Sequence, residues 1–179
     1  MKKLVLKFGG TSVGTIEKIK KVANIIKKRL NEGNQIIVVV SAMSDQTNKL
    51  IELAKDFGVE GTIDPEYDAL LSTGEDVSAS LLTIALKKLG VNARSWRGWQ
   101  VPINTDSFFS NAKIKSVNTN NLIQSFKNDL EVAVISGFQG VEVDSRITTL
   151  GRGGSDTSAV AIAASIGSER CDIYTDVSG

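Results

Sequence analysis

The sequence contains no histidine among its 179 residues. That absence excludes Ser-His-Asp catalysis, His-ligated zinc sites and histidine general bases. Any reaction catalysed by this chain must therefore proceed without a side chain whose ordinary pKa lies near neutral pH.

Cysteine is nearly absent as well, since Cys171 stands alone and cannot form an internal disulfide. Its apolar neighbours predict a buried strand residue with a structural role. The 21 Lys and Arg residues against 20 Asp and Glu leave a net charge of +1. This balance supplies no broad field for nucleic acid or an anionic membrane, and we expect neither as a partner.

Long hydrophobic runs are also missing. The apolar run 4–6 near the N-terminus is too short for a signal-peptide core, and no stretch approaches the ~20 residues of a membrane span. We therefore expect a cytoplasmic protein. A chain of this length fits one domain, which we place at residues 1–179.

Short apolar runs alternate with helical periodicity along the whole chain. Strands are predicted at 4–8, 35–42, 131–138 and 171–177, and helices at 16–30, 46–57, 65–71 and 76–89. In the segment 151–167, a glycine loop opens a further helix that stops at Gly167. Apolar strands of this kind belong in parallel sheets. The expected fold is α/β, a three-layer sandwich whose mainly parallel central sheet is covered by helices on both faces.

Two segments are less regular. "ARSWRGWQ" (93–100) predicts an edge strand, and its tryptophans indicate packing rather than a nucleic-acid platform because few basic residues surround them. Residues 104–121 are rich in Asn, Ser and Thr, which predicts loops around one short strand.

The polar motifs follow the predicted strands, where α/β sheets bind ligands. In "KFGGTSVGT", Gly9 and Gly10 can take positive φ and approach a ligand closely, while nearby amides and hydroxyls donate to anionic oxygens. The loop matches neither a Walker A motif nor a dinucleotide fingerprint. A simple tight turn is the alternative, but Lys7 at the end of an apolar strand calls for an anionic partner.

A second glycine loop, "TTLGRGGSD", opens a helix of small residues. Ser155 or Asp156 as an ordinary N-cap explains part of it, but leaves Arg152 unexplained. A guanidinium between glycines suits bidentate capture of a carboxylate. In "LLSTGEDVS", Glu75 taken alone is better interpreted as an acidic residue at a helix start. Together these loops fit an amino acid meeting a nucleoside triphosphate.

Six segments, in order and spacing, resemble the aspartate kinase catalytic domain of the amino acid kinase family. They are "KFGGTSVG", "VVVSAMSDQTN", "LLSTGEDVS", "SGFQG", "TTLGRGGSDTSAVAIAA" and "IYTDVSG". The lysine-glycine-glycine and GRGGSDT signatures are specific together, whereas either alone is weak. The resemblance implies ATP-dependent phosphorylation of the side-chain carboxylate of L-aspartate to 4-phospho-L-aspartate, which feeds lysine, threonine and methionine synthesis.

The resemblance also implies a role for particular residues. Catalysis would fall to Lys7 and Asp156, with Mg²⁺ held through the ATP phosphates rather than by a protein metal site. Substrate binding would fall to Ser41, Thr47, Glu75, Arg152, Gly153, Gly154 and Ser155. ATP binding would fall to Lys7, Gly9, Gly10, Ser12, Thr175 and Asp176.

This reaction would need no histidine, because the side-chain carboxylate of L-aspartate is already ionised at pH 7 and needs no base to attack phosphorus. Members of the family continue beyond the segment that matches "IYTDVSG" and usually add regulatory ACT-type domains. For a chain ending at Gly179 we therefore expect an incomplete kinase domain without ACT domains, weak MgATP binding, slow or absent turnover and a tendency to form homo-oligomers.

Three alternatives stay open at this point. The first is a kinase of the same family for glutamate, N-acetylglutamate, carbamate or UMP, although Glu75 and Arg152 favour a free amino acid. The second is a ligand-binding or interaction remnant without turnover. The third, a nicotinamide-binding domain, ranks last because its glycine fingerprint and ribose-binding acid are missing.

Overall fold

The computed structural model describes residues 2–59 and 64–175. The strands are β1 (Lys2–Phe8), β2 (Asn34–Val40), β3 (Ala93–Trp96), β4 (Ile103–Thr105), β5 (Ile114–Val117), β6 (Val132–Ser136), β7 (Gln139–Val141), β8 (Ile147–Thr149) and β9 (Arg170–Tyr174). The helices are α1 (Ile16–Asn31), α2 (Gln46–Lys55), α3 (Pro65–Lys88), α4 (Asn120–Lys127) and α5 (Gly154–Ile166).

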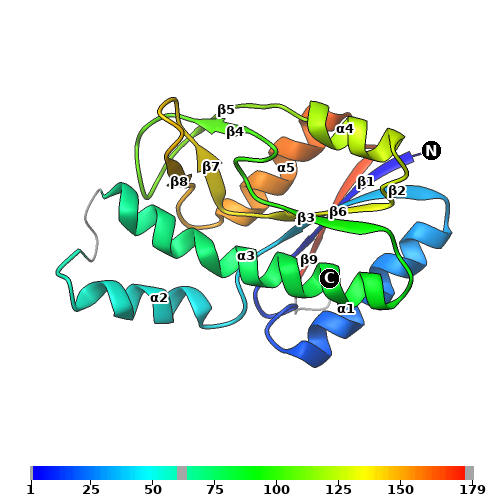
Figure 1. Ribbon diagram of the computed structural model, residues 1–179, viewed down its shortest axis with the longest axis horizontal. Coiled ribbons are helices and arrows are strands. Elements are labelled where there is room, and N and C mark those ends of the chain that lie inside the picture. The colour runs from blue at the N-terminus through cyan, green and yellow to red at the C-terminus, as the bar shows by residue number, and fades with distance from the viewer. Residues whose placement is uncertain (1, 60–63, 176–179) are drawn as a thin grey trace.

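A five-stranded parallel sheet forms the centre of the molecule, in the order β3-β6-β2-β1-β9. Helices α1 and α3 lie on one side of it, and α4 and α5 lie on the other (Figure 1). The predicted three-layer α/β fold with a mainly parallel sheet is therefore confirmed. Because all five strands are parallel, their carboxyl ends share one edge.

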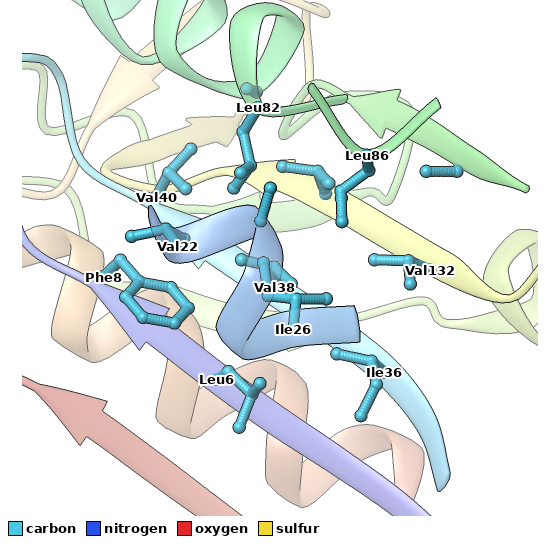
Figure 2. Packing of buried hydrophobic residues seen from close by; sticks show 14 of the residues in the cluster. Leu6, Phe8, Val22, Ile26, Ile36, Val38, Val40, Leu82, Leu86 and Val132 are labelled. Atoms are coloured by element: carbon cyan, nitrogen blue, oxygen red, sulfur yellow. The ribbon is translucent and has the colours of Figure 1, made fainter. Parts of the chain in front are cut away.

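The two faces of the sheet bury different residues of the same strands. In β1, Leu4, Leu6 and Phe8 pack toward α1 and α3, whereas Val5 packs toward α5. Figure 2 shows the first of these layers, with Leu6, Phe8, Val22 and Ile26 among its side chains. This two-sided burial explains why the strand sequences are apolar throughout instead of alternating.

Helix α3 is one continuous helix of 24 residues, where the sequence predicted two helices, at 65–71 and 76–89. The prediction broke the helix at Gly74, which lies inside it. A Cβ built on Gly74 would stand 2.9 Å from Cβ of Ala42, so the glycine allows the helix to approach the loop after β2. Glu75 therefore lies in mid-helix, and its interpretation as a helix-start residue is wrong.

The described residues include a helix whose length and composition would allow a membrane span, namely α3. Half of its most apolar window is buried inside the molecule. This is weak evidence for a span, since a core helix of a soluble fold passes the same test.

A second sheet of four strands, in the order β5-β4-β7-β8, was not predicted. Strands β7 and β8 form an antiparallel hairpin, and β4 joins β7 through one parallel pair. These strands have only three or four residues each, too few for a readable alternation. The segment 104–121, predicted to hold one short strand, contributes to two, β4 and β5.

Two smaller predictions had different outcomes. The edge-strand prediction for 93–100 is correct for β3, which pairs only with β6 within the described residues. Arg94 lies 3.9 Å above the ring of Trp96.

Cys171 lies in β9 as predicted but is only partly buried, because β9 is the outermost described strand. Burial and nearby carboxylates raise the pKa of its thiol, which disfavours the reactive thiolate.

Candidate functional site

A cavity of about 210 Å³ lies at the carboxyl edge of the parallel sheet. Every residue predicted to bind the substrate lines it: Ser41, Thr47, Glu75, Arg152, Gly153, Gly154 and Ser155. Lys7 and Asp156 line it too. The structure thus brings into one cavity side chains that the sequence separates by up to 149 positions.

Lys7 and Asp156 form an ion pair inside this cavity. Nζ of Lys7 lies 2.6 Å from Oδ1 of Asp156. Lys7 is buried near the end of β1, and Asp156 belongs to the first turn of α5. An ammonium in this position supplies positive charge beside a carboxylate that half faces solvent.

Glu75 reaches the cavity from the middle of α3. It is buried, and its Oε1 accepts a hydrogen bond of 3.0 Å from the backbone amide of Ala42. Its Oε2 is buried without a hydrogen-bond partner. Burial, reinforced by neighbouring Asp76, raises the Glu75 pKa to about 7 against the amide's opposing effect. An unpaired buried carboxylate oxygen is costly, which makes it a candidate ligand atom.

Arg152 stands on the loop between β8 and α5, with an exposed side chain at the mouth of the cavity. Gly153 follows with φ of 76°, and a side chain there would be strained in this left-handed conformation. The N-cap position of α5 is occupied by Gly153, and no side chain caps the helix with a hydrogen bond. The N-cap explanation for Ser155 or Asp156 is therefore wrong.

The first glycine loop is built differently from the prediction, because neither Gly9 nor Gly10 has positive φ. Close approach explains Gly10, since a Cβ there would stand 2.7 Å from the carbonyl oxygen of Ala42. At Gly9 a Cβ would stand 3.5 Å from Nζ of Lys7. Glycine at position 9 therefore leaves the space beside the ammonium open.

The predicted ATP-binding residues Ser12 and Thr175 do not line the cavity. The amide of Ser12 donates to the carbonyl of Gly9 at 3.0 Å and so closes the turn after β1. Thr175 follows β9, one residue past the register pair of Phe8 and Tyr174, at the same sheet edge. Asp176 lies outside the described residues.

The sequence analysis missed Phe138 as a cavity residue. It has φ of 68°, a left-handed conformation that is uncommon for residues other than glycine. Its amide donates to Oγ of Ser158, and its carbonyl accepts from the amide of Leu150. Both backbone polar groups of Phe138 are therefore hydrogen-bonded. The motif "SGFQG" marked the turn, but propensity favours glycine at such a position and gave no signal for Phe138.

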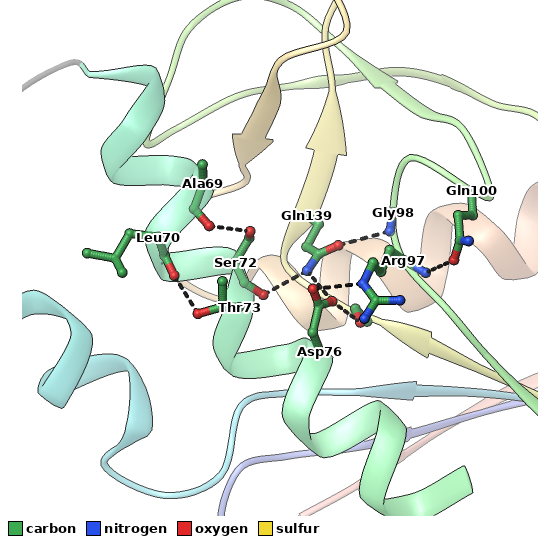
Figure 3. Close-up of polar contacts among 10 residues, drawn as sticks. Ala69, Leu70, Ser72, Thr73, Asp76, Arg97, Gly98, Gln100 and Gln139 are labelled. Carbon is green, nitrogen blue, oxygen red and sulfur yellow. Dashed lines mark hydrogen bonds and ion pairs between the residues drawn. The ribbon is translucent and has the colours of Figure 1, made fainter.

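Behind the cavity, Asp76 ties α3 to both sheets (Figure 3). Its carboxylate accepts from Oγ of Ser136 at 2.8 Å, Nε2 of Gln139 at 2.9 Å and Nε of Arg97 at 3.0 Å. Gln139 also donates to the carbonyl of Ser72. Adjacent acids thus have separate tasks, since Asp76 is satisfied within the protein whereas Glu75 retains a free oxygen.

A larger hollow of about 740 Å³ lies over the second sheet and includes Trp99, Lys115 and Glu142. Its size does not make it the better candidate. The smaller cavity combines an ion pair, an unpaired buried carboxylate oxygen and an arginine at the sheet edge where α/β folds bind ligands.

Several known proteins are similar in sequence to this chain. The chain is 49% identical over 176 residues to an aspartokinase of Bacillus sp. (strain MGA3), covering 98% of this chain and 42% of that protein. It is 50% identical over 176 residues to an aspartate kinase of Stutzerimonas stutzeri, with the same shares covered. The chain thus spans less than half the length of these curated relatives.

Solved structures of aspartate kinases are also similar to this chain. The crystal structure of aspartate kinase from Synechocystis matches with a TM-score of 0.80 at 43% identity, covering 97% of this chain and 28% of that one. Aspartokinase III of E. coli in complex with aspartate and ADP matches with a TM-score of 0.85 at 26% identity, covering 98% and 49%. The model of the amino acid kinase family matches residues 2–179. The chain belongs to the amino acid kinase family.

Proposed function

We propose that this chain is the catalytic part of an aspartate kinase, which transfers the γ-phosphoryl group of ATP to the side-chain carboxylate of L-aspartate. The observation that carries the proposal is the shared cavity, where Glu75 presents an unpaired oxygen, Arg152 a guanidinium and Lys7 an ammonium. These charges complement an α-ammonium, an α-carboxylate and a phosphate. The complex of the E. coli relative with aspartate and ADP supports the same assignment.

In this proposal Glu75 binds the α-ammonium and Arg152 the α-carboxylate, which leaves the side-chain carboxylate of the substrate as the attacking group. Ser41, Thr47, Gly153, Gly154 and Ser155 shape the walls around it. An oxygen of this carboxylate forms a bond to the γ-phosphorus while the bond to the β,γ-bridging oxygen breaks, giving 4-phospho-L-aspartate and ADP. Positioning two anions in line is the main catalytic task.

Lys7 lies where it can neutralise charge on the transferred group, and Asp156 holds its ammonium in place at 2.6 Å. Gly9, Gly10 and Ser12 would form the adjoining phosphate loop. Thr175 and Asp176 would bind the nucleoside, and of these two the structure describes only Thr175. The space kept open at Gly9 suits phosphate oxygens next to Lys7. Mg²⁺ would arrive with the ATP phosphates and offset their charge, consistent with a loop that offers amides and one carboxylate rather than a ligand cluster.

We further propose that residues 1–179 act as one domain of a cytoplasmic enzyme that serves lysine, threonine and methionine synthesis. Self-association through exposed sheet edges remains a prediction.

The direct test is detection of an acyl phosphate. Because slow turnover is expected, the purified protein is incubated over a long period with MgATP, L-aspartate and hydroxylamine. It should accumulate an aspartyl hydroxamate together with ADP. Succinate lacks the α-ammonium, and β-alanine lacks the α-carboxylate, so each should give at most a small fraction of this signal. Equal hydroxamate from L-glutamate or N-acetylglutamate, or equal ADP release with carbamate or UMP, would contradict the assignment of aspartate. No L-aspartate binding in a titration would contradict it at the first step.

A further inference from the structure

Asp68 is a fully buried carboxylate that no step of the proposed reaction uses. It lies on α3 with 0% of its surface exposed. Its Oδ2 accepts hydrogen bonds from the backbone amides of Thr149 at 2.6 Å and Ser110 at 2.8 Å. Its Oδ1 accepts from Oγ of Ser110 at 2.9 Å. Three donors, one from the end of strand β8 and two from Ser110, therefore meet on one side chain.

The contact with Thr149 leads directly to the cavity, because Thr149 ends β8 and Arg152 follows three residues later. The carbonyl of Thr149 accepts from the amide of Ala112 at 2.9 Å. Ser110, two residues before Ala112, has φ of 65°, a conformation that its bonds to Asp68 help to stabilise. Asp68 thus accepts the hydrogen bond of the Thr149 amide directly. Through Ser110 it also positions the segment that bonds the Thr149 carbonyl.

The short path from Thr149 to Arg152 has little freedom. The amide of Leu150 donates to the carbonyl of Phe138 at 3.0 Å. Gly151 has φ of 73°, and a Cβ there would lie 2.7 Å from Oδ1 of Asn111. A displacement of Thr149 is therefore passed on to Arg152 instead of being absorbed by a flexible loop.

Asp68 and Glu75 are seven residues apart on the same helix, close to two turns, so they share a face. We propose that Asp68 is a positioning residue which holds Arg152 at the correct distance from Glu75. Helix α3 then sets both halves of the amino-acid site, Glu75 directly and Arg152 through Asp68 and Thr149. This inference rests on the proposed function for the identity of the ligand, L-aspartate.

The matched variants are Asp68→Ala and Asp68→Asn. Alanine removes all three hydrogen bonds. Asparagine can keep the two backbone bonds with its amide oxygen, while its amide group donates to the hydroxyl of Ser110, which can also accept. The control is Glu142→Ala in the turn between β7 and β8, where Oε1 of Glu142 accepts from the amides of Asp144 at 3.0 Å and Arg146 at 2.9 Å.

Binding of L-aspartate should be measured by NMR titration. Asp68→Ala should weaken it by roughly tenfold or more, as expected when buried hydrogen bonds that place a ligand group are lost. Asp68→Asn should restore most of the affinity, and Glu142→Ala should leave it near the wild-type value. Equal weakening by Asp68→Ala and Glu142→Ala, or no recovery with asparagine, would overturn the proposal.

A double-mutant cycle separates positioning from general stability. If Asp68 acts through Arg152, then Asp68→Ala should add little to the loss already caused by Arg152→Ala. Additive losses would overturn the inference. Should Asp68→Ala fail to fold, Ser110→Ala takes its place in the cycle, since it removes one of the three bonds and leaves the carboxylate.

Hydrogen exchange gives a readout that needs no ligand. In Asp68→Ala or Ser110→Ala, the amides of residues 147–153 should exchange faster, whereas those of α1 should not. Unchanged exchange in 147–153 would overturn the positioning role even if aspartate binds. Faster exchange there, with no aspartate binding to the wild-type protein, would instead contradict the proposed function and leave the placement of Arg152 by Asp68 standing.

Discussion

Nζ of Lys7 lies 2.6 Å from Oδ1 of Asp156, so the end of β1 and the first turn of α5 meet in one ion pair. The two residues are 149 positions apart in the sequence, and each follows or precedes a glycine loop. Lys7 is buried, whereas about half of the Asp156 side chain is exposed toward the cavity. The pair therefore orients the ammonium without enclosing it, and an anionic group can still reach it.

In a protein that carries the whole kinase domain, replacing Lys7 by alanine should reduce kcat for aspartate phosphorylation by roughly a hundredfold or more, because charge stabilisation in the transition state is lost. The KM for L-aspartate should change much less, since the binding groups proposed for L-aspartate are Glu75 and Arg152. Steady-state kinetics of the hydroxamate reaction measure both parameters. Lys18→Ala is the matched control, because the side chain of this exposed lysine donates to the carbonyl of Thr11 and does not line the cavity. A loss confined to KM would show that Lys7 binds substrate instead.

Replacing Glu75 by glutamine should weaken L-aspartate binding by roughly tenfold or more, because a charged hydrogen bond to the α-ammonium becomes a neutral one. Titration calorimetry gives the affinity. Glu66→Gln, on an exposed part of the same helix, should have little effect. Unchanged affinity in Glu75→Gln would remove this residue from the site.

Aspartate binding should also release protons around pH 6 to 7. The Glu75 pKa is raised to about 7 in the free protein, so part of the population is protonated there. The substrate ammonium favours the ionised form, which means that the affinity should fall as pH drops below 7. Calorimetry in buffers of different ionisation enthalpy counts the protons, and Glu75→Gln should release none. Proton uptake on binding would contradict the prediction.

The same group should make the free protein less stable at higher pH. Its pKa rises from 4.5 in the unfolded chain to about 7 in the fold, so the native state binds the extra proton between these values. The Glu75 contribution is fully present below pH 4.5 and is lost as pH rises through 7, by roughly 3 kcal/mol in total. The free energy of unfolding should be measured in urea for wild type and Glu75→Gln from pH 4.5 to 8. As pH rises, the wild type should lose stability relative to the glutamine variant. A constant difference would show that the carboxyl is not perturbed.

The two glycines after β1 should respond differently to alanine. At Gly10 the new Cβ would stand 2.7 Å from the carbonyl oxygen of Ala42, so Gly10→Ala should destabilise the fold by roughly 1 to 3 kcal/mol. At Gly9 the nearest atom is Nζ of Lys7 at 3.5 Å, so Gly9→Ala should affect the reaction more than the stability. Denaturant unfolding and steady-state kinetics of both variants make the comparison. Equal losses of stability would refute the distinction.

The sequence predicted the layers of the fold well, because strands buried on both faces and amphipathic helices have strong patterns. Its failures have local causes. Gly74 looked like a helix boundary, although close packing against Ala42 is what requires it. The strands of the second sheet are too short to show a period, and their position depends on buried contacts such as that of Asp68 with Thr149.

The candidate site was predictable where charge stood in an apolar or glycine-rich setting, as at Lys7 and Arg152. Glu75 drew its significance from the resemblance, since its position near an apparent helix start offered a simpler explanation. Phe138 and Asp68 carried no such signal. Their importance comes from a left-handed backbone and from three converging donors, and neither can be recognised before the chain is folded.

Side chains of β1 alternate between the two faces of the sheet, so the position of each side chain in this strand decides whether it can reach the site. Val5 faces the α5 side of the sheet and Lys7 meets Asp156 of α5, while Leu6 and Phe8 face α1 and α3. A single-residue insertion between Val5 and Lys7 would turn the ammonium into the apolar layer and Phe8 out of it. Length changes in this strand can therefore preserve the chemistry only in steps of two residues, which restricts how the N-terminal segment of this chain can vary.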